Sequence, residues 1–170
     1  FLSYLPSSVH ERAERTEPTD DPNRREEFLI DIVPTDGKTP YKPRRIVEAC
    51  VDQGSFFEIG PHWGRGIVAG FARIDGFPVG VLAGDPFFLD GAWTADTCDK
   101  VTRHVDLCDT FHLPIIHFVD CAGFAVGVKH ETAGVTRKGV RVMSAVYQSD
   151  VPICSVVIRK AFGLAGSAMM

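Results

Sequence analysis

Three short turns of this sequence have small residues directly after an apolar run, where a catalytic or binding site could form. They cover residues 83–91, 120–124 and 162–166. Glycine allows a positive φ and a close approach of the backbone to a ligand, and a helix start offers free N–H groups and a dipole that favours negative charge. Such turns could form an oxyanion hole for an enolate or a polarised carbonyl, where each donor contributes about 3 kcal/mol. Ordinary strand-to-helix turns are the alternative interpretation.

Side chains that could act as catalysts or ligands lack the partners that these roles need. The six histidines show no metal-ligand spacing such as HExxH. His117 lies in an apolar run, which is typical of a core histidine with satisfied polar atoms. His104 and His112 fall on or just after an expected helix and are expected to be surface or packing residues. Cys121 follows a strand end without an evident histidine partner, which disfavours a nucleophilic thiol. Asp120 could cap the next turn or face a ligand.

Composition and missing motifs exclude several classes of protein. The net charge of -4 disfavours a nucleic-acid surface. No apolar run reaches the roughly 18 residues that cross a bilayer, and the P-loop, GxGxxG and GxSxG motifs are absent. The five cysteines include no CxxC pair, so we expect reduced thiols in a cytosol-like compartment.

Periodicity and turn signals predict the elements that must position these turns. Two apolar runs joined by Asp75 and Gly76 predict a β-hairpin. The predicted strands cover residues 56–59, 67–74, 77–84, 115–120 and 152–158, and the predicted helices cover 44–52, 95–111 and 131–148, with a last helix after Gly163. In the helix over 95–111 one apolar stripe contains Cys98, Val101, Val105, Cys108 and Phe111. In the helix over 131–148 we expect these residues to face inward: Val135, Val140, Met143, Val146 and Tyr147.

The order of these elements predicts an α/β fold. A hairpin is followed by strands that alternate with helices, and this alternation implies right-handed crossovers and a parallel sheet. Ligands of such sheets bind at the carboxyl ends of the strands, where all three glycine turns fall. Residues 1–40 are expected to form a linker or N-terminal arm, because residues 8–25 are rich in charge and proline without apolar periodicity.

Five segments, in this order along the chain, resemble a known family. They read GSFFE (54–58), GVLA (80–83), KVTRHVDLCDTF (100–111), PIIHFVDCAGFAVG (114–127) and RKAFGLA (159–165). The combination resembles the carboxyltransferase β subunits of propionyl-CoA, acetyl-CoA and methylcrotonyl-CoA carboxylases, from about Tyr41 to the last residue. Because the chain starts at Phe1 and stops at Met170 inside an expected helix, we expect part of a longer polypeptide.

The resemblance implies a crotonase-like (ClpP/crotonase) β-β-α superhelix, of which this chain would be a single incomplete half-domain. Residues 41–170 would be the C-terminal carboxyltransferase domain, truncated at its C-terminus. Complete subunits would have two such halves and form a ring hexamer, with each active site between halves of different subunits. The implied partners are an acyl-CoA substrate and a biotin carboxylase or biotin carrier subunit. The implied location is the cytoplasm, or the mitochondrial matrix in a eukaryote.

The implied activity moves a carboxyl group from carboxybiotin to the α-carbon of propionyl-CoA or acetyl-CoA. Biotin, carried on a separate domain, is the expected cofactor, a coenzyme A thioester is the expected substrate, and no metal is expected in this domain. Carboxybiotin would release CO2, the biotin nitrogen would remove the α-proton, and the resulting enolate would attack CO2. The protein would mainly position both partners and stabilise oxyanions. This chain alone is expected to be inactive, because the other half mainly holds the acyl-CoA.

The resemblance also implies the site residues. In the family the N–H pair that stabilises the biotin oxygen follows the RKxFG segment, which corresponds here to Leu164 and Ala165, next to Gly163. The implied pocket for biotin and acyl-CoA contains Ala122, Gly123, Phe124, Phe162, Gly166 and Ser167. The family often has proline at the place of Ala122 and glycine at that of Leu164. Leucine disfavours a positive φ, so the second departure could alter the geometry of the loop.

Three other functions stay open on the sequence alone. A biotin-dependent decarboxylase subunit would use the same fold in reverse, and a catalytically inactive assembly subunit would fit the departures at Ala122 and Leu164. A crotonase-type hydratase or isomerase would need a pair of catalytic glutamates, and only Glu131 lies in the right neighbourhood. The sequence therefore favours the carboxyltransferase.

Overall fold

A mixed sheet of five strands forms the centre of the protein, in the order β1-β2-β3-β4-β5. The structure is a computed structural model that describes residues 1–18 and 20–168. The strands are β1 (Phe57–Glu58), β2 (Ile67–Ile74), β3 (Phe77–Gly84), β4 (Ile115–Cys121) and β5 (Ile153–Ala161). β1, β2 and β3 pair antiparallel, whereas β3, β4 and β5 pair parallel. The hairpin of β2 and β3 and the parallel pairing after it are therefore confirmed.

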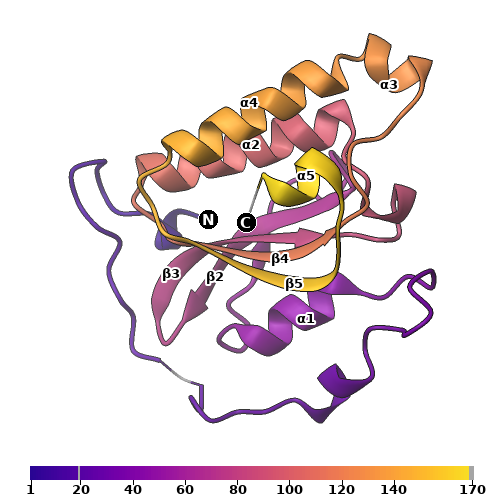
Figure 1. Ribbon diagram of the computed structural model, residues 1–170. Helices are drawn as coiled ribbons and strands as arrows, with labels where there is room; N and C mark the ends of the chain where they lie inside the picture. The colour runs from indigo at the N-terminus through magenta and orange to yellow at the C-terminus, as the bar shows by residue number, and fades with distance from the viewer. Residues whose placement is uncertain (19, 169–170) are drawn as a thin grey trace.

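Helices cover both faces of this sheet (Figure 1). α2 (Ala95–Thr110) and α4 (Val135–Gln148) pack side by side over one face, and α1 (Pro43–Cys50) packs on the other. The two apolar clusters follow this division, because one contains the buried stripe of α2 and the other contains the buried residues of α1. The strands between them are buried on both faces, which explains their nearly continuous apolar sequence. Among the described residues, no helix has the length and apolar character to cross a membrane.

α2 follows its predicted bounds closely. The Oγ1 of Thr94 caps it by accepting a hydrogen bond from the N–H of Thr97 at 3.3 Å. Four residues of the predicted stripe are fully buried, namely Cys98, Val101, Val105 and Cys108, and Phe111 is partly buried beside them. The prediction of a core-facing stripe is confirmed.

The helix predicted over residues 131–148 is broken in the structure. α3 (Val128–Thr132) ends first, and α4 begins after Gly134, which has a left-handed φ of 77° that interrupts the helical path. The predicted inward face was also partly wrong. Val135 is buried and Met143 and Val146 are partly buried, but Val140 and Tyr147 are exposed. The face that packs on α2 contains Gly139 and Val142 instead.

β5 and the short helix α5 (Gly163–Ser167) end the described part of the chain. β5 reaches Ala161, three residues beyond its predicted end, because its pairing with β4 resumes after an irregularity. Its exposed side chains include Val156 and Val157, so it is less covered than the strands beside it.

The described residues 1–18 and 20–40 run around the outside of the molecule, past the tip of the β2–β3 hairpin and then alongside α1 (Figure 1). They include two 3-10 helices, η1 (Leu2–Tyr4) and η2 (Glu27–Ile30). The Tyr4 ring stacks on Phe71 at a centroid distance of 5.8 Å, and its hydroxyl donates to the carbonyl of Ser55 at 2.5 Å. The arm is therefore packed on the body at several points, and a domain boundary at residue 41 stays a prediction.

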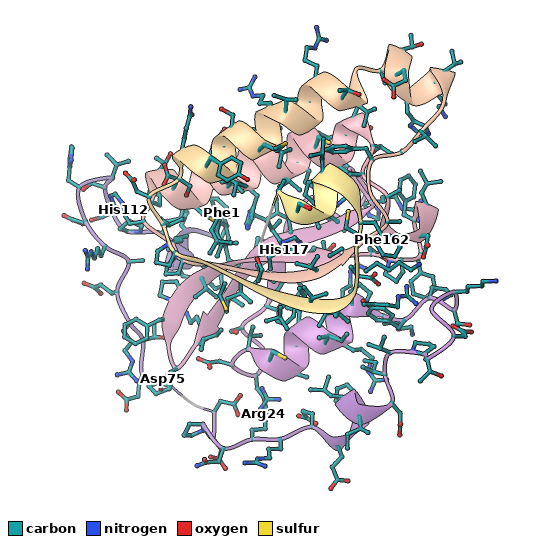
Figure 2. All side chains as sticks on the ribbon, in the orientation of Figure 1. Phe1, Arg24, Asp75, His112, His117 and Phe162 are labelled. Carbon is teal, nitrogen blue, oxygen red and sulfur yellow. The ribbon has the colours of Figure 1, made fainter. Side chains whose placement is uncertain are left out.

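The buried histidines belong to the core. His104 and His117 are 5% and 1% exposed, and burial lowers the pKa of each to about 4, so both are neutral at physiological pH. His117 lies on β4 in the middle of the sheet (Figure 2). His112 is exposed, and its Nε2 lies 2.9 Å from the carbonyl of Val9. The core position predicted for His117 is confirmed, but the prediction that its polar atoms are satisfied is not, because within the described residues its buried Nδ1 has no hydrogen-bond partner.

The two valines of α4 provide a matched test of its packing. Val142 is fully buried and Val140 is 60% exposed, although they lie on the same helix. We expect Val142→Ala to lower the free energy of unfolding by about 2 kcal/mol, through lost burial and a cavity. Val140→Ala should change it by less than about 0.5 kcal/mol. Urea denaturation followed by circular dichroism measures both, and equal losses would contradict the observed face of α4.

Candidate functional site

The second and third glycine turns lie together at one end of the sheet. Figure 2 shows Phe162 at the end opposite the hairpin residue Asp75. The N–H of Phe162 donates to the carbonyl of Cys121 at 3.0 Å, which ties the end of β5 to the end of β4. A Cβ added to Gly123 would lie 3.5 Å from the carbonyl oxygen of Phe162. The two turns are therefore in contact through their backbones.

The first turn joins the same edge through close backbone contacts. A Cβ on Gly84, at the end of β3, would lie 2.1 Å from the carbonyl oxygen of Asp120. A Cβ on Gly91, in η3 (Leu89–Gly91), would lie 2.6 Å from the same oxygen. No side chain fits at either distance, so glycine is required for packing at both positions. The structure thus brings the three predicted turns to one place.

The N-terminus of α5 presents backbone donors at this edge. The N–H of Gly166 is bonded to the carbonyl of Phe162 at 3.2 Å. Within the described residues, the N–H groups of Gly163, Leu164 and Ala165 have no hydrogen-bond acceptor, as is usual in a first helical turn. A Cβ on Gly163 would meet no atom within 4 Å, so the space in front of the turn is open.

Leu164 fits this turn without backbone strain. The positive φ of 61° falls on Gly163, and Leu164 is not among the residues with a positive φ. Leucine therefore occupies an ordinary helical position, and its N–H is retained. The concern that this departure from the family pattern would distort the loop is removed by the structure.

The side chains around the donors are mainly apolar. Phe162 and Leu164 are 59% and 63% exposed, whereas Ala165 and Gly166 are buried against the end of β5. The Ser167 hydroxyl donates to the carbonyl of Gly163 at 3.0 Å, so it is engaged within α5 itself. The rim of the turn is therefore apolar, while its backbone is polar.

The loop after β4 is held from two sides. Gly123 has a φ of 99° and Ala122 does not need a positive φ, so alanine in place of proline leaves this turn intact. The carbonyl of Gly123 accepts from the N–H of Trp93 at 2.9 Å, and the Phe124 ring meets the Trp93 ring edge-on at 6.4 Å. A Cβ on Gly139 would lie 2.3 Å from the Phe124 ring, so α4 leaves a space for this ring.

The side chains of Cys121 and Glu131 do not support catalytic roles. Burial raises the pKa of the Cys121 thiol to about 11, so it stays protonated, and its sulfur lies 3.4 Å from the N–H of Gly123. Glu131 is exposed in α3 and accepts a hydrogen bond from the Thr136 hydroxyl at 3.3 Å. In the part of the chain that the structure describes, no three His, Cys, Asp or Glu side chains lie close enough to bind a metal ion.

Asp120 has partners that the sequence did not indicate. Its carboxylate is buried and accepts hydrogen bonds from the Tyr41 hydroxyl at 2.8 Å and from the Nε of Arg159 at 3.2 Å. It also accepts from the N–H of Lys160 at 3.2 Å. Tyr41 lies before the first helix and Arg159 lies on the last strand, so no local pattern could link them to Asp120. A buried charged residue at the end of an apolar strand was the only available signal.

Comparison with known proteins assigns this arrangement to a family. The sequence matches the model of the carboxyl transferase domain over residues 1–170. It is 38% identical to the propionyl-CoA carboxylase carboxyltransferase subunit of Haloferax mediterranei, covering 99% of this chain and 33% of that protein. It is 36% identical to the methylmalonyl-CoA decarboxylase subunit alpha of Veillonella parvula, covering 96% and 32%.

A solved structure shows the same fold. The chain superimposes on transcarboxylase 12S, a hexamer crystallised with hydrolysed methylmalonyl-coenzyme A, with a TM-score of 0.94 and 36% identity. The match covers 99% of this chain and 32% of that one. The fold is thus the expected crotonase-like one, in a partial domain, and the chain spans about a third of the length of these relatives.

A substitution at Gly139 tests the packing of the Phe124 ring against α4. Alanine in place of glycine inside a helix normally stabilises it by about 1 kcal/mol. Here we expect Gly139→Ala to destabilise the protein by about 1–3 kcal/mol, because the new methyl group overlaps the Phe124 ring and displaces the loop after β4. Thermal unfolding measures this change. The double variant Gly139→Ala/Phe124→Leu should recover part of the loss, and a stabilised single variant would contradict the packing.

Proposed function

We propose, since this chain belongs to the carboxyl transferase domain family, that it contributes to the carboxyltransferase half-reaction of a biotin-dependent acyl-CoA carboxylase. This reaction moves a carboxyl group from carboxybiotin to the α-carbon of a short-chain acyl-CoA, either propionyl-CoA or acetyl-CoA. The likeness to the propionyl-CoA carboxylase subunit of Haloferax mediterranei supports this substrate class.

The observation that carries the proposal is the set of free N–H donors at the start of α5. In the part of the chain that the structure describes, the N–H groups of Leu164 and Ala165 have no acceptor, and they lie beside the open face of Gly163. Backbone donors that are fixed before the reaction stabilise negative charge on an oxygen atom without reorganisation. We assign to Leu164 and Ala165, together with Gly163, the role of an oxyanion hole. No catalytic side chain is needed for that role.

The residues around these donors fit a biotin ring. The ring combines an apolar body with a polar carbonyl oxygen, and the site offers exposed apolar side chains on Phe162 and Leu164 next to backbone donors. When bound, biotin supplies the carboxyl group and the basic nitrogen of the reaction. The turn of Ala122, Gly123 and Phe124 contacts the start of α5, so it would shape the same pocket, with Gly166 and Ser167 at its base.

The proposed activity needs more than this chain. The sequence spans about a third of its relatives, so we propose that it acts within a longer subunit whose other half binds the acyl-CoA. A ring hexamer, like the hexamer of transcarboxylase 12S, is the proposed assembly. A biotin carboxylase or biotin carrier subunit is the proposed partner.

A decarboxylase is the second candidate function. The methylmalonyl-CoA decarboxylase subunit of Veillonella parvula is about as similar to this chain as the carboxylase subunit is. Both reactions pass a carboxyl group between the same two carriers, so the same donors would serve either direction. An inactive assembly subunit is less well supported, because Leu164 retains both its helical conformation and its N–H.

The reverse half-reaction tests the proposal. We expect the full-length subunit to consume methylmalonyl-CoA or malonyl-CoA when free biocytin is the acceptor and ATP is absent. The preferred thioester would identify the acyl group. A coupled assay of the decarboxylated product, propionyl-CoA or acetyl-CoA, would measure the rate. The 170-residue chain alone serves as the control and should show no turnover.

Each outcome of this assay has a distinct meaning. Turnover that depends on biocytin supports the carboxyltransferase. Thioester loss without biocytin would indicate a simple decarboxylase or hydrolase and would contradict the proposal. No turnover from a correctly assembled hexamer would favour the assembly subunit.

Loss of a single backbone donor tests the oxyanion hole. Proline has no N–H but fits the first turn of a helix, so Leu164→Pro removes one donor and can keep the turn. We expect kcat to fall about 100- to 1,000-fold in the reverse assay. Leu164→Ala is the matched control, because it shortens the side chain and keeps the N–H, and it should stay within about fivefold of the wild type. An unchanged rate in the proline variant would assign the oxyanion hole elsewhere.

A further inference from the structure

The ladder between β4 and β5 breaks directly before the candidate site. Val119 pairs with Val157, and the next pair joins Cys121 to Ala161. One residue on β4, Asp120, therefore faces a three-residue segment of β5, residues 158–160. Bulges of this kind bend a strand and redirect the chain beyond it, and here the chain continues into Phe162 and α5.

Hydrogen bonds to the Asp120 carboxylate take the place of the backbone pairing that is interrupted between β4 and β5. Its Oδ1 accepts from the N–H of Lys160 inside the bulge, and its Oδ2 accepts from the Nε of Arg159 and from the Tyr41 hydroxyl. The residue is 1% exposed, and a buried carboxylate is stable only with such partners. The bulge therefore has one defined shape, which depends on this side chain.

Arg159 connects the bulge to the rest of the edge. Its side chain is only 8% exposed, its Nη1 donates to the carbonyl of Thr39 at 2.9 Å, and its guanidinium lies over the Tyr41 ring at 5.1 Å. Its Nη2 lies 3.1 Å from Asp120 and 3.7 Å from Asp90, which also pairs with Lys160. The loop after β3, the arm and β5 thus share one network of charges.

We propose that Asp120 and Arg159 are positioning residues that fix the free N–H donors of α5. The backbone between the bulge and these donors is short, because only Ala161 and Phe162 separate Lys160 from Gly163. The N–H of Phe162 is tied to Cys121, next to Asp120, so a shift of the bulge moves the start of α5. The predicted change in kcat rests on the proposed function. The predicted change in the position of the donors does not.

Neither residue needs to touch a substrate in this role. The Asp120 oxygens are occupied by Tyr41, Arg159 and the N–H of Lys160, and its side chain is covered by the chain. Its action passes through the backbone of β5. A residue that only stabilised the fold would affect the amount of folded protein, whereas a positioning residue changes the rate of each correctly folded site.

The test uses Asp120→Asn in the full-length subunit, in the reverse assay with biocytin. The amide keeps the size and the acceptor for Tyr41 but removes the charge that pairs with Arg159. We expect kcat per folded hexamer to fall about 100-fold, as for a misplacement of about 1 Å, with the KM for the acyl-CoA changed less than threefold. Asp75→Asn is the matched control, because Asp75 pairs with Arg15 at the hairpin end of the sheet, opposite Phe162 (Figure 2), and should stay within twofold.

Two further variants cover the case in which Asp120→Asn fails to fold. Tyr41→Phe removes only the hydroxyl that donates to Asp120, and should lower kcat about 10-fold. Arg159→Gln should lower kcat as much as Asp120→Asn does, and the double variant should be no slower than the slower single variant, because the two residues act as a unit. Fully multiplicative losses would overturn the proposed coupling.

Hydrogen exchange separates this proposal from the proposed function. The peptide that covers residues 161–168 should exchange at least 10-fold faster in Tyr41→Phe and Asp120→Asn than in the wild type and in Asp75→Asn. Faster exchange without any wild-type carboxyl transfer would support the positioning role and reject the proposed function. Wild-type transfer with unchanged exchange and kcat in both variants would overturn the positioning role alone.

Discussion

The close approach of three chain segments to Asp120 is the constraint on which this end of the molecule depends. Its carbonyl oxygen leaves room only for glycine at positions 84 and 91, so the loop after β3 can pack there. Its carboxylate fills the break between β4 and β5 and binds Tyr41 from the arm. One residue thus contacts three chain segments at once: its backbone meets the loop after β3, and its side chain meets β5 and the arm. Interiors packed this closely transmit small shifts to their neighbours instead of absorbing them.

The sequence was most informative where a signal is local. The hairpin of β2 and β3 has its predicted bounds, because a two-residue Asp-Gly turn between apolar runs specifies both strands. The helix α2 and its stripe followed from apolar spacing and a threonine cap. The inward face of α4 was partly wrong because five residues along a helix turn it by about 140°. Val140 therefore lies far around the helix from Val135, whereas Gly139 and Val142 lie on its face.

The residues of the candidate site also fall into two groups, those that local sequence signals predicted and those that they did not. Its glycine turns could be predicted, since small residues at the ends of parallel strands meet at one edge of the sheet. Tyr41 and Arg159 could not, because the hydrogen bonds that bring them to Asp120 join residues 79 and 39 positions apart. The bulge that lengthens β5 was also hidden, since it is decided by pairing with another strand. What sequence alone indicated was a charged residue at the end of a buried strand.

A site made of backbone donors tolerates side-chain substitutions at positions that do not need a positive φ. The positive φ values fall on Gly123 and Gly163, so Ala122 and Leu164 can differ from the family pattern without moving the chain. The Leu164 side chain is mostly exposed, and its N–H stays at the open face of the turn. Substitutions at the rim therefore change the shape and polarity around the donors, while the donors themselves depend on glycine and on the bulge beneath them.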